Sequence, residues 1–117
     1  MINFDNRRFR SVSTTTNGEV SSETIFEYQQ AGDVVSATYA GGTIEFGHLI
    51  GLIDNEGVMD IRYHHLNTFG LLMTGICRSI PEVLSDGRIR LHETWRWTSG
   101  DESEGVSVLE EVINGED

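Results

Sequence analysis

The sequence has no lysine, one cysteine, one proline and no long apolar run, and these absences exclude several classes of protein. Because all eight permanently cationic residues are arginine, neither Schiff-base catalysis nor a lysine general base is available. The single Cys77 cannot form an intramolecular disulfide, which makes the cytoplasm the expected location. No apolar stretch approaches the roughly 20 residues of a membrane-spanning helix, and the N-terminus lacks the apolar core of a secretory signal.

Positive charge is scarce as well, since the formal net charge is −11. A chain this acidic is a poor partner for nucleic acid and for anionic membranes, so we expect neither. Seven of the nineteen acidic residues lie after residue 100, where we expect a solvated C-terminus that frays over residues 114–117. A length of 117 residues predicts a single domain over 1–117.

Glycine recurs at short intervals and marks seven turns, which divide the chain into about eight segments. No segment has a convincing helical period. We expect strands at 7–14, 20–30, 33–40, 43–53, 58–66, 71–80, 88–97 and 106–113. Short strands linked by tight turns predict an all-β fold, and closure removes the exposed edges of the sheet. The predicted architecture is a single up-and-down antiparallel β-barrel of about eight strands.

Segment 88–97 shows the clearest pattern, a strict alternation over ten residues that is typical of a strand with two unlike faces. One face holds Ile89, Leu91, Glu93, Trp95 and Trp97; the other holds Arg88, Arg90, His92, Thr94 and Arg96. A carboxylate is costly to bury unless it is paired or hydrogen-bonded. Glu93 is therefore either a satisfied core carboxylate, or a ligand anchor or general acid–base whose pKa burial raises.

The turns also predict which side chains point inward, because directly paired residues lie on the same side of a sheet. We take Ala31-Gly32 and Gly41-Gly42 as two-residue loops, Asp54–Gly57 and Asn67–Gly70 as four-residue loops, and Ile80 as the partner of Gly87. Besides the Glu93 face, the inner set is then Thr24, Phe26, Tyr28, Val35, Ala37, Tyr39, Ile44, Phe46, His48, Ile50, Leu52, Met59, Ile61, Tyr63, His65, Leu72, Thr74, Ile76 and Arg78. For strand 71–80 the opposite facing fits equally well, because Leu71, Met73 and Cys77 also suit an interior.

Several runs resemble a family of small bacterial proteins of about this length. They are Gly47–Ile53, Ile61–Asn67, Leu72–Cys77 and Leu91–Asp101, and the similarity extends from about Phe9 to Val112. Members are often named N-acetylglutamate synthases, and the resemblance implies an avidin-like or lipocalin-like barrel. The sequence has no strand–turn–helix signal for a coenzyme pyrophosphate, so we do not expect acetyltransferase activity. No catalytic residues can be transferred from this resemblance.

The expected ligand-lining residues come from the inner set. They are Tyr28, His48, Tyr63, Thr74, Arg78, Glu93, Trp95 and Trp97, of which Glu93, His48 and Tyr63 are also catalytic candidates. A metal site would require three converging ligands. His48, His65 and Glu93 could supply them, but no closely spaced ligand motif is present, and we expect neither metal nor cofactor. Buried Cys77 is expected to be an inert small hydrophobe.

Three functional hypotheses follow from this set. The first is a non-enzymatic barrel that binds a small molecule, and Arg78 in the inner set favours a ligand that bears a carboxylate. The second is a cofactor-free isomerase or lyase in which Glu93 acts as acid or base while Tyr63 and His48 orient the substrate. The third is a structural barrel with a filled core that acts through its surface, for example as a homodimer.

Overall fold

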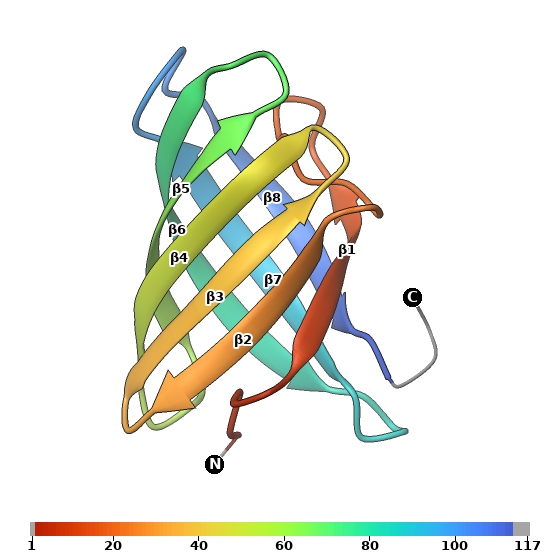
Figure 1. The fold of residues 1–117 in the computed structure, drawn as a ribbon. Helices are drawn as coiled ribbons and strands as arrows, with labels where there is room; N and C mark the ends of the chain where they lie inside the picture. Colours follow the sequence, from red (N-terminus) through yellow and green to blue (C-terminus); the bar gives the residue numbers. More distant parts are fainter. Residues whose placement is uncertain (1, 114–117) are drawn as a thin grey trace.

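The computed structural model describes residues 2–113, and its eight strands form one closed antiparallel barrel (Figure 1). The strands are β1 (Arg8–Thr14), β2 (Ile25–Ala31), β3 (Val34–Gly41), β4 (Ile44–Ile53), β5 (Met59–Asn67), β6 (Leu72–Val83), β7 (Ile89–Trp97) and β8 (Glu104–Glu111). Each pairs with its neighbour in sequence, and β1 pairs with β8 to close the ring. The predicted all-β meander barrel is confirmed. The expected fraying at 114–117 concerns residues outside those described.

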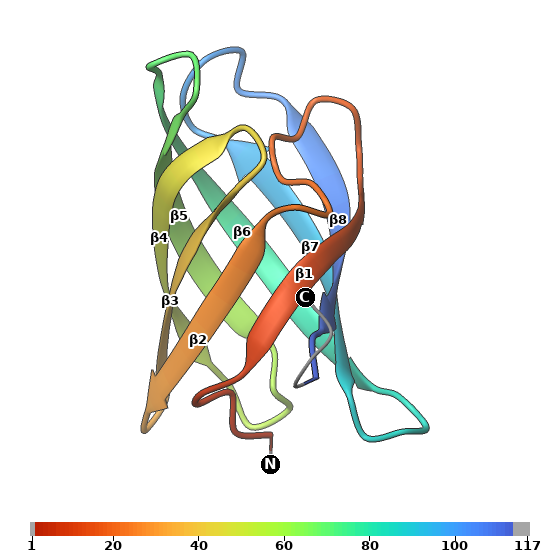
Figure 2. The same ribbon diagram turned by 45° about the vertical axis from the view of Figure 1, so that its right-hand side comes forward.

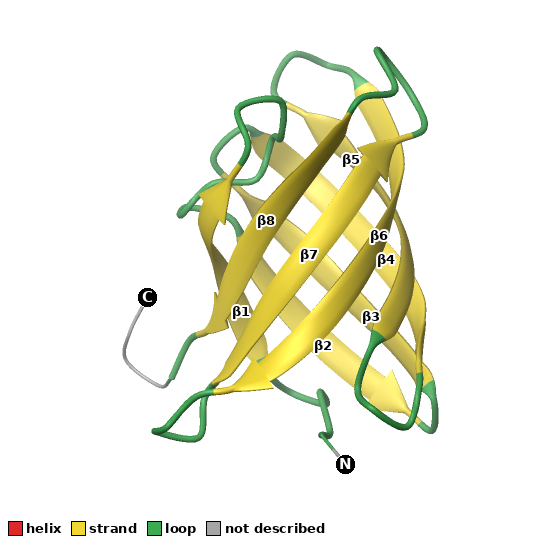
Figure 3. Cartoon of the chain, turned by 180° about the vertical axis from the view of Figure 1, so that it is seen from behind, coloured by secondary structure: helices red, strands yellow, loops and turns green. Residues whose placement is uncertain are grey.

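The described chain consists of strands and loops, as the view from behind shows (Figure 3). It contains no helix long and apolar enough to cross a membrane. The largest boundary difference is at β2, which begins at Ile25 and not at residue 20. The preceding segment 15–24 is a loop at one end of the barrel, and the N-terminus lies at the other end (Figure 2). We call these the upper and the lower end.

Three hairpin loops contain three residues, whereas the sequence analysis gave two of them four. Backbone hydrogen bonds close them from Asp54 to Val58, from Asn67 to Leu71 and from Leu84 to Arg88. Each loop ends on a glycine with positive φ, namely Gly57 (+83°), Gly70 (+80°) and Gly87 (+89°). This is the usual geometry of a three-residue hairpin, a turn followed by a left-handed residue that glycine adopts without strain. A loop shortened by one residue exchanges the two faces of the next strand.

A β-bulge near the start of β4 has the same effect on that strand. The register shifts between Ile44 and Phe46, so that two consecutive residues, Glu45 and Phe46, are both exposed. From Gly47 onward the inner face of β4 is therefore the one that the sequence analysis placed outside. The bulge and the shorter 55–57 loop cancel, which explains why β5 faces as predicted.

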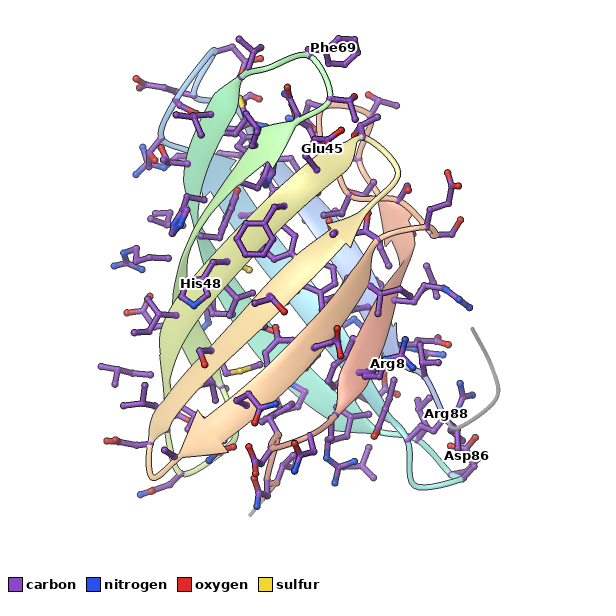
Figure 4. All side chains as sticks on the ribbon, viewed as in Figure 1. Arg8, Glu45, His48, Phe69, Asp86 and Arg88 are labelled. Atoms are coloured by element: carbon purple, nitrogen blue, oxygen red, sulfur yellow. The ribbon has the colours of Figure 1, made fainter. Side chains whose placement is uncertain are left out.

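The assigned facing of β4 and β6 was therefore wrong. Phe46, His48, Ile50 and Leu52 lie on the outer surface, and Figure 4 shows His48 there. On β6 the outward residues are Leu72, Thr74, Ile76 and Arg78, and the inward ones are Met73, Gly75, Cys77 and Ser79. Ile80 pairs with His92 and not with Gly87, which restores the predicted facing of β7.

The lower half of the barrel is a packed aromatic core. Phe4, from the N-terminal segment, contacts Phe9 and Tyr28 with ring centroids 6.1 and 6.0 Å away, and all three side chains are fully buried. The Tyr28 hydroxyl has no hydrogen-bond partner among the described residues. Tyr28 thus points inward as predicted, but it lies in this core.

In the upper half, large rings lie flat on glycines of the neighbouring strand. Tyr39 faces Gly47, Tyr63 faces Gly75 and Trp95 faces Gly105 across their strand pairs. A Cβ atom at any of these glycines would collide with the ring above it. The rings therefore lie against the barrel wall. Larger side chains in place of the glycines would push these rings into the lumen.

We expect Gly75→Ala to destabilise the protein by about 1–3 kcal/mol, because the new methyl group displaces the Tyr63 ring. The check is urea unfolding of wild type, Gly75→Ala, Tyr63→Ala and the double variant. In the Tyr63→Ala background the glycine substitution should cost little. An equal cost in both backgrounds would show that the ring does not restrict this position.

Candidate ligand-binding site

The upper half of the barrel encloses a cavity of about 50 Å³. It is lined by Gly18, Glu19, Val20, Phe26, Tyr39, Leu49, Ile61, Tyr63, His65, Cys77, Glu93, Trp95, Trp97 and Ser107. One water molecule needs on the order of 10–15 Å³ of such space, counted for the centre of a water-sized sphere, so the cavity admits several waters or a small organic group. The barrel interior is thus filled in its lower half and hollow in its upper half.

Aromatic side chains form most of the cavity wall. The Trp97 ring contacts Trp95, His65 and Tyr63, with centroids 5.4, 5.7 and 5.8 Å away. Both indole N–H groups are already used within the protein. Trp95 donates to the Ser107 hydroxyl at 2.9 Å, and Trp97 donates to the carbonyl of Asn17 at 3.0 Å. The two tryptophans therefore offer apolar surface to a ligand.

Glu93 projects from the middle of β7 into this apolar space, flanked by Ser79 on β6 and Ser107 on β8. Removal from water raises its pKa from 4.5 to about 7, and the neighbouring Ser79 and Cys77 offset only part of the rise. Ser79 and Cys77 are its nearest polar neighbours, and the Ser79 hydroxyl forms no hydrogen bond of good geometry. Within residues 2–113 no cation pairs with Glu93.

The Tyr39 and Tyr63 hydroxyls and the Cys77 thiol in the cavity keep their protons. Burial raises the pKa of the Tyr39 and Tyr63 hydroxyls and of the Cys77 thiol, and the nearby Glu93 carboxylate raises them further. Tyr63 makes no hydrogen bond to another described side chain or backbone group, and its ring lines the cavity. It can therefore serve as a hydrogen-bond donor to an occupant.

A second polar cluster lies at the upper mouth of the cavity. The Tyr39 hydroxyl contacts His65 Nδ1 at 2.9 Å, and His65 Nε2 contacts Glu19 Oε1 at 2.8 Å. Asn67 Nδ2 donates to both Glu19 oxygens, at 3.2 and 3.3 Å. Since a carboxylate only accepts, Nε2 of His65 carries a proton. The Tyr39 hydroxyl also lies 3.4 Å from the His64 carbonyl, so its one proton serves either this oxygen or Nδ1 of His65.

Four of the eight predicted lining residues surround the cavity: Tyr63, Glu93, Trp95 and Trp97. Tyr28 lies below it, and three predictions of inward facing were wrong. His48 faces outward against His64 at a ring distance of 5.7 Å, Thr74 is hydrogen-bonded to Thr98 at 2.7 Å, and Arg78 is exposed. The shortened loop and the bulge that invert β6 and β4 account for all three. A ligand role for the four lining residues stays a prediction.

The inverted strands also separate the potential metal ligands. His48 is outside the barrel, while His65 and Glu93 are inside, so these three side chains do not converge. Over the described range, no group of three or more His, Cys, Asp or Glu side chains could hold a metal ion.

The sequence analysis missed the mouth cluster. Tyr39 and His65 were assigned inward, but His65 was considered only as a potential metal ligand, and nothing connected either residue with Glu19. Asn67 was interpreted as a turn residue, and Glu19 lay beside a strand expected to start at residue 20. The signal that could have found Asn67 is its place directly before a three-residue loop. There its Oδ1 accepts hydrogen bonds from the Phe69 and Leu71 amides.

Glu93 should make the protein less stable as pH rises. Its folded-state pKa of about 7 lies above the unfolded value of 4.5, so the stabilisation present below pH 4.5 is lost between these two values. The free energy of unfolding of Glu93→Gln should exceed that of wild type by a margin that grows by up to about 3 kcal/mol from pH 5 to pH 8. The measurement is urea unfolding at both pH values, with Glu27→Gln on the outer face as control. A difference between Glu93→Gln and wild type that does not change with pH would contradict the burial of this charge.

The sequence matches the family described as avidin-like proteins over residues 2–112, which includes all eight strands. No match is found among curated proteins or among solved structures. The family match agrees with the eight-stranded closed meander. The chain belongs to the family of avidin-like proteins.

Proposed function

We propose that the protein binds a small, partly apolar molecule in the upper half of the barrel, between Trp97 and Glu93. The observation that carries this proposal is the Glu93 carboxyl, which lines an apolar cavity beside the Tyr63 ring, has no cationic partner among the described residues and has only the Ser79 hydroxyl and the Cys77 thiol as polar neighbours. Buried polar groups are normally hydrogen-bonded, and a site that is not satisfied by the protein is suited to a ligand. Membership of a family of small-ligand binders supports a binding barrel.

The chemistry at the bottom of the cavity favours a neutral polar group in the ligand. With a pKa of about 7, Glu93 exists in both protonation states at neutral pH and can either donate or accept. Tyr63 stays protonated and donates. Arg78, the reason for expecting a carboxylate, is on the outer surface and cannot reach this depth. An amide or hydroxyl beside Glu93 and an apolar body against Trp95 and Trp97 fit these groups.

A second candidate function is cofactor-free isomerase or lyase chemistry. The single observation in its favour is the raised pKa of Glu93. A general acid–base works best when its pKa is close to the working pH. Glu93 would transfer the proton and Tyr63 would orient the substrate, whereas His48 has no part because it faces outward. For an enzyme, Glu93→Gln should reduce turnover by about 10²–10⁴-fold while substrate still binds. A pure binder would show no turnover in either protein.

The predicted homodimer and the cytoplasmic location stay predictions. An apolar outer surface supports the homodimer: Phe46, Ile50 and Leu52 on β4, Leu66 on β5 and Leu72 on β6 are all exposed. Apolar surface of this kind is a common component of subunit contacts.

Binding can be followed directly, because the only two tryptophans of the chain both line the cavity. Benzamide is a suitable probe, since it combines a flat apolar ring with an amide. We expect saturable quenching of tryptophan fluorescence, with roughly tenfold weaker binding to Tyr63→Phe after loss of one hydrogen bond. The outer-face variant Thr74→Ala should bind like wild type. If neither benzamide nor its methyl- and hydroxyl-substituted derivatives quenched saturably, the proposal would be contradicted.

A further inference from the structure

Two histidines stand side by side on the outer surface of the barrel. His48 on β4 and His64 on β5 are directly paired across the two strands, and their ring centroids are 5.7 Å apart. His64 is exposed and His48 is half-buried, and Figure 4 shows His48 on the outside of the barrel. Because the hydrogen-bonded strand pair fixes both backbone positions, the two imidazoles form a preorganised pair that solvent can reach.

The ring nitrogens of this pair are not engaged by the protein. His65 and His92 each contact a carboxylate oxygen at 2.8 Å. Neither His48 nor His64, in contrast, forms a hydrogen bond or ion pair with another described residue. A neutral imidazole presents one nitrogen lone pair, which is a preferred ligand of zinc, copper and nickel ions. The pair therefore offers two adjacent metal-binding atoms.

The spacing of the two rings suits a shared metal ion. With metal–nitrogen distances of about 2 Å, the centroids of two imidazoles on one tetrahedral ion lie about 5 Å apart. The observed 5.7 Å is close to this value, so small side-chain rotations bring both nitrogens to one ion. The residues paired with the histidines on the flanking strands, Thr38 and Thr74, are uncharged. Arg62, two positions before His64, forms an ion pair with Asp60 at 2.7 Å, which compensates its charge.

One chain supplies only half of a closed zinc site. Structural zinc ions are held by four protein ligands in a tetrahedron. Within residues 2–113 no third His, Cys, Asp or Glu joins the pair. A two-fold axis through the ion would bring the same two histidines from a second copy, and four imidazoles complete the tetrahedron.

The reach of the histidines agrees with ordinary packing of two sheets. A histidine side chain places a metal ion about 5–6 Å from its strand, so an ion held from both sides leaves the sheets about 10–12 Å apart. Face-to-face sheets pack about 10 Å apart. The side chains around the ion can therefore touch those of the second copy.

The surface around the pair is suited to such a contact. Phe46 and Ile50 flank His48 along β4 and are 59% and 52% exposed. Leu66 and Leu72 extend the apolar surface across β5 and β6. Two chains that each carry a net charge of −11 repel each other, and a dication between them offsets part of this repulsion. An apolar contact without the ion lacks this compensation.

We propose that His48 and His64 of two copies bind one divalent zinc-type ion on a two-fold axis, and that this ion joins two barrels into a homodimer through the outer face of β4, β5 and β6. The ion lies outside the barrel wall, so the proposal is independent of the function of the cavity. It gives the predicted homodimer an interface, a symmetry and a metal ion. Because coordination is reversible, a chelator separates the two copies.

Removal and return of zinc tests the bridge. Protein treated with EDTA and then dialysed should be mainly monomeric in analytical ultracentrifugation. One zinc ion per two chains should then strengthen dimerisation at least about tenfold, because the ion binds the dimer better than the monomer. Renewed EDTA should reverse the change. Magnesium, which prefers oxygen ligands, should have no effect.

Matched variants identify the ligands. His48→Ala and His64→Ala lie on the outer surface and should fold, but each should lose the response to zinc. His92→Ala removes an exposed histidine of β7 and should respond like wild type. Ile50→Glu keeps both histidines and should prevent dimerisation, because it places a carboxylate in the apolar contact. Cobalt(II), whose visible absorption is strong in tetrahedral complexes, should give strong absorption with wild type and little with His48→Ala.

Three results would overturn the proposal. The first is a dimer affinity that is equal in zinc and in EDTA. The second is zinc binding by a protein that stays monomeric, since the ion then does not join two copies. The third is a zinc response that persists in both His48→Ala and His64→Ala, which places the ion elsewhere.

Discussion

Closure of the sheet between β1 and β8 is the constraint on which the rest of the structure depends. Because every strand has two neighbours, an inward side chain has only the lumen available, and eight strands leave room for side chains or one small ligand. The closing pair contains an irregularity between Ser11 and Ser13. Everything inside the barrel is then decided by which residues the register turns inward. The two halves of this barrel use the lumen differently.

The lower half resembles the core of any small protein, because Phe9 and Tyr28 pack edge to face, Phe4 lies tilted against both, and all three are fully buried. The upper half keeps space because its rings lie against glycine-lined wall, and it contains polar groups that such a space cannot solvate well. A carboxylate with a pKa near 7 in an apolar cavity lowers the stability of the folded state at neutral pH. A barrel with a purely structural role would be more stable with an uncharged residue in place of Glu93. Functional sites, in contrast, commonly retain groups at the expense of stability.

The fold could be predicted from the sequence because alternation and glycine turns are local signals. The facing of each strand depends on whether the preceding loop has an odd or an even number of residues. A difference of one residue in that loop exchanges the two faces of the strand. Reading Asn67–Gly70 as a four-residue loop placed Thr74 and Arg78 inside, although Met73 and Cys77 also fitted an interior. The inward facing of Glu93 was predicted correctly because the four parity errors before β7 cancelled in two pairs. Glu19 and Asn67 could not be found, because their contact joins a loop to a strand 48 positions further along the chain.

The central claim is that the upper half of the barrel is a ligand pocket with Glu93 and Tyr63 as its polar contacts. The most direct measurement is a high-resolution crystal structure of the purified protein, inspected for electron density between Glu93 and Trp97. The account predicts ordered density, from water or from a co-purified small molecule, within hydrogen-bond distance of the Glu93 carboxyl and the Tyr63 hydroxyl. A collapsed interior, in which these two side chains are hydrogen-bonded to each other and no space remains, would contradict it.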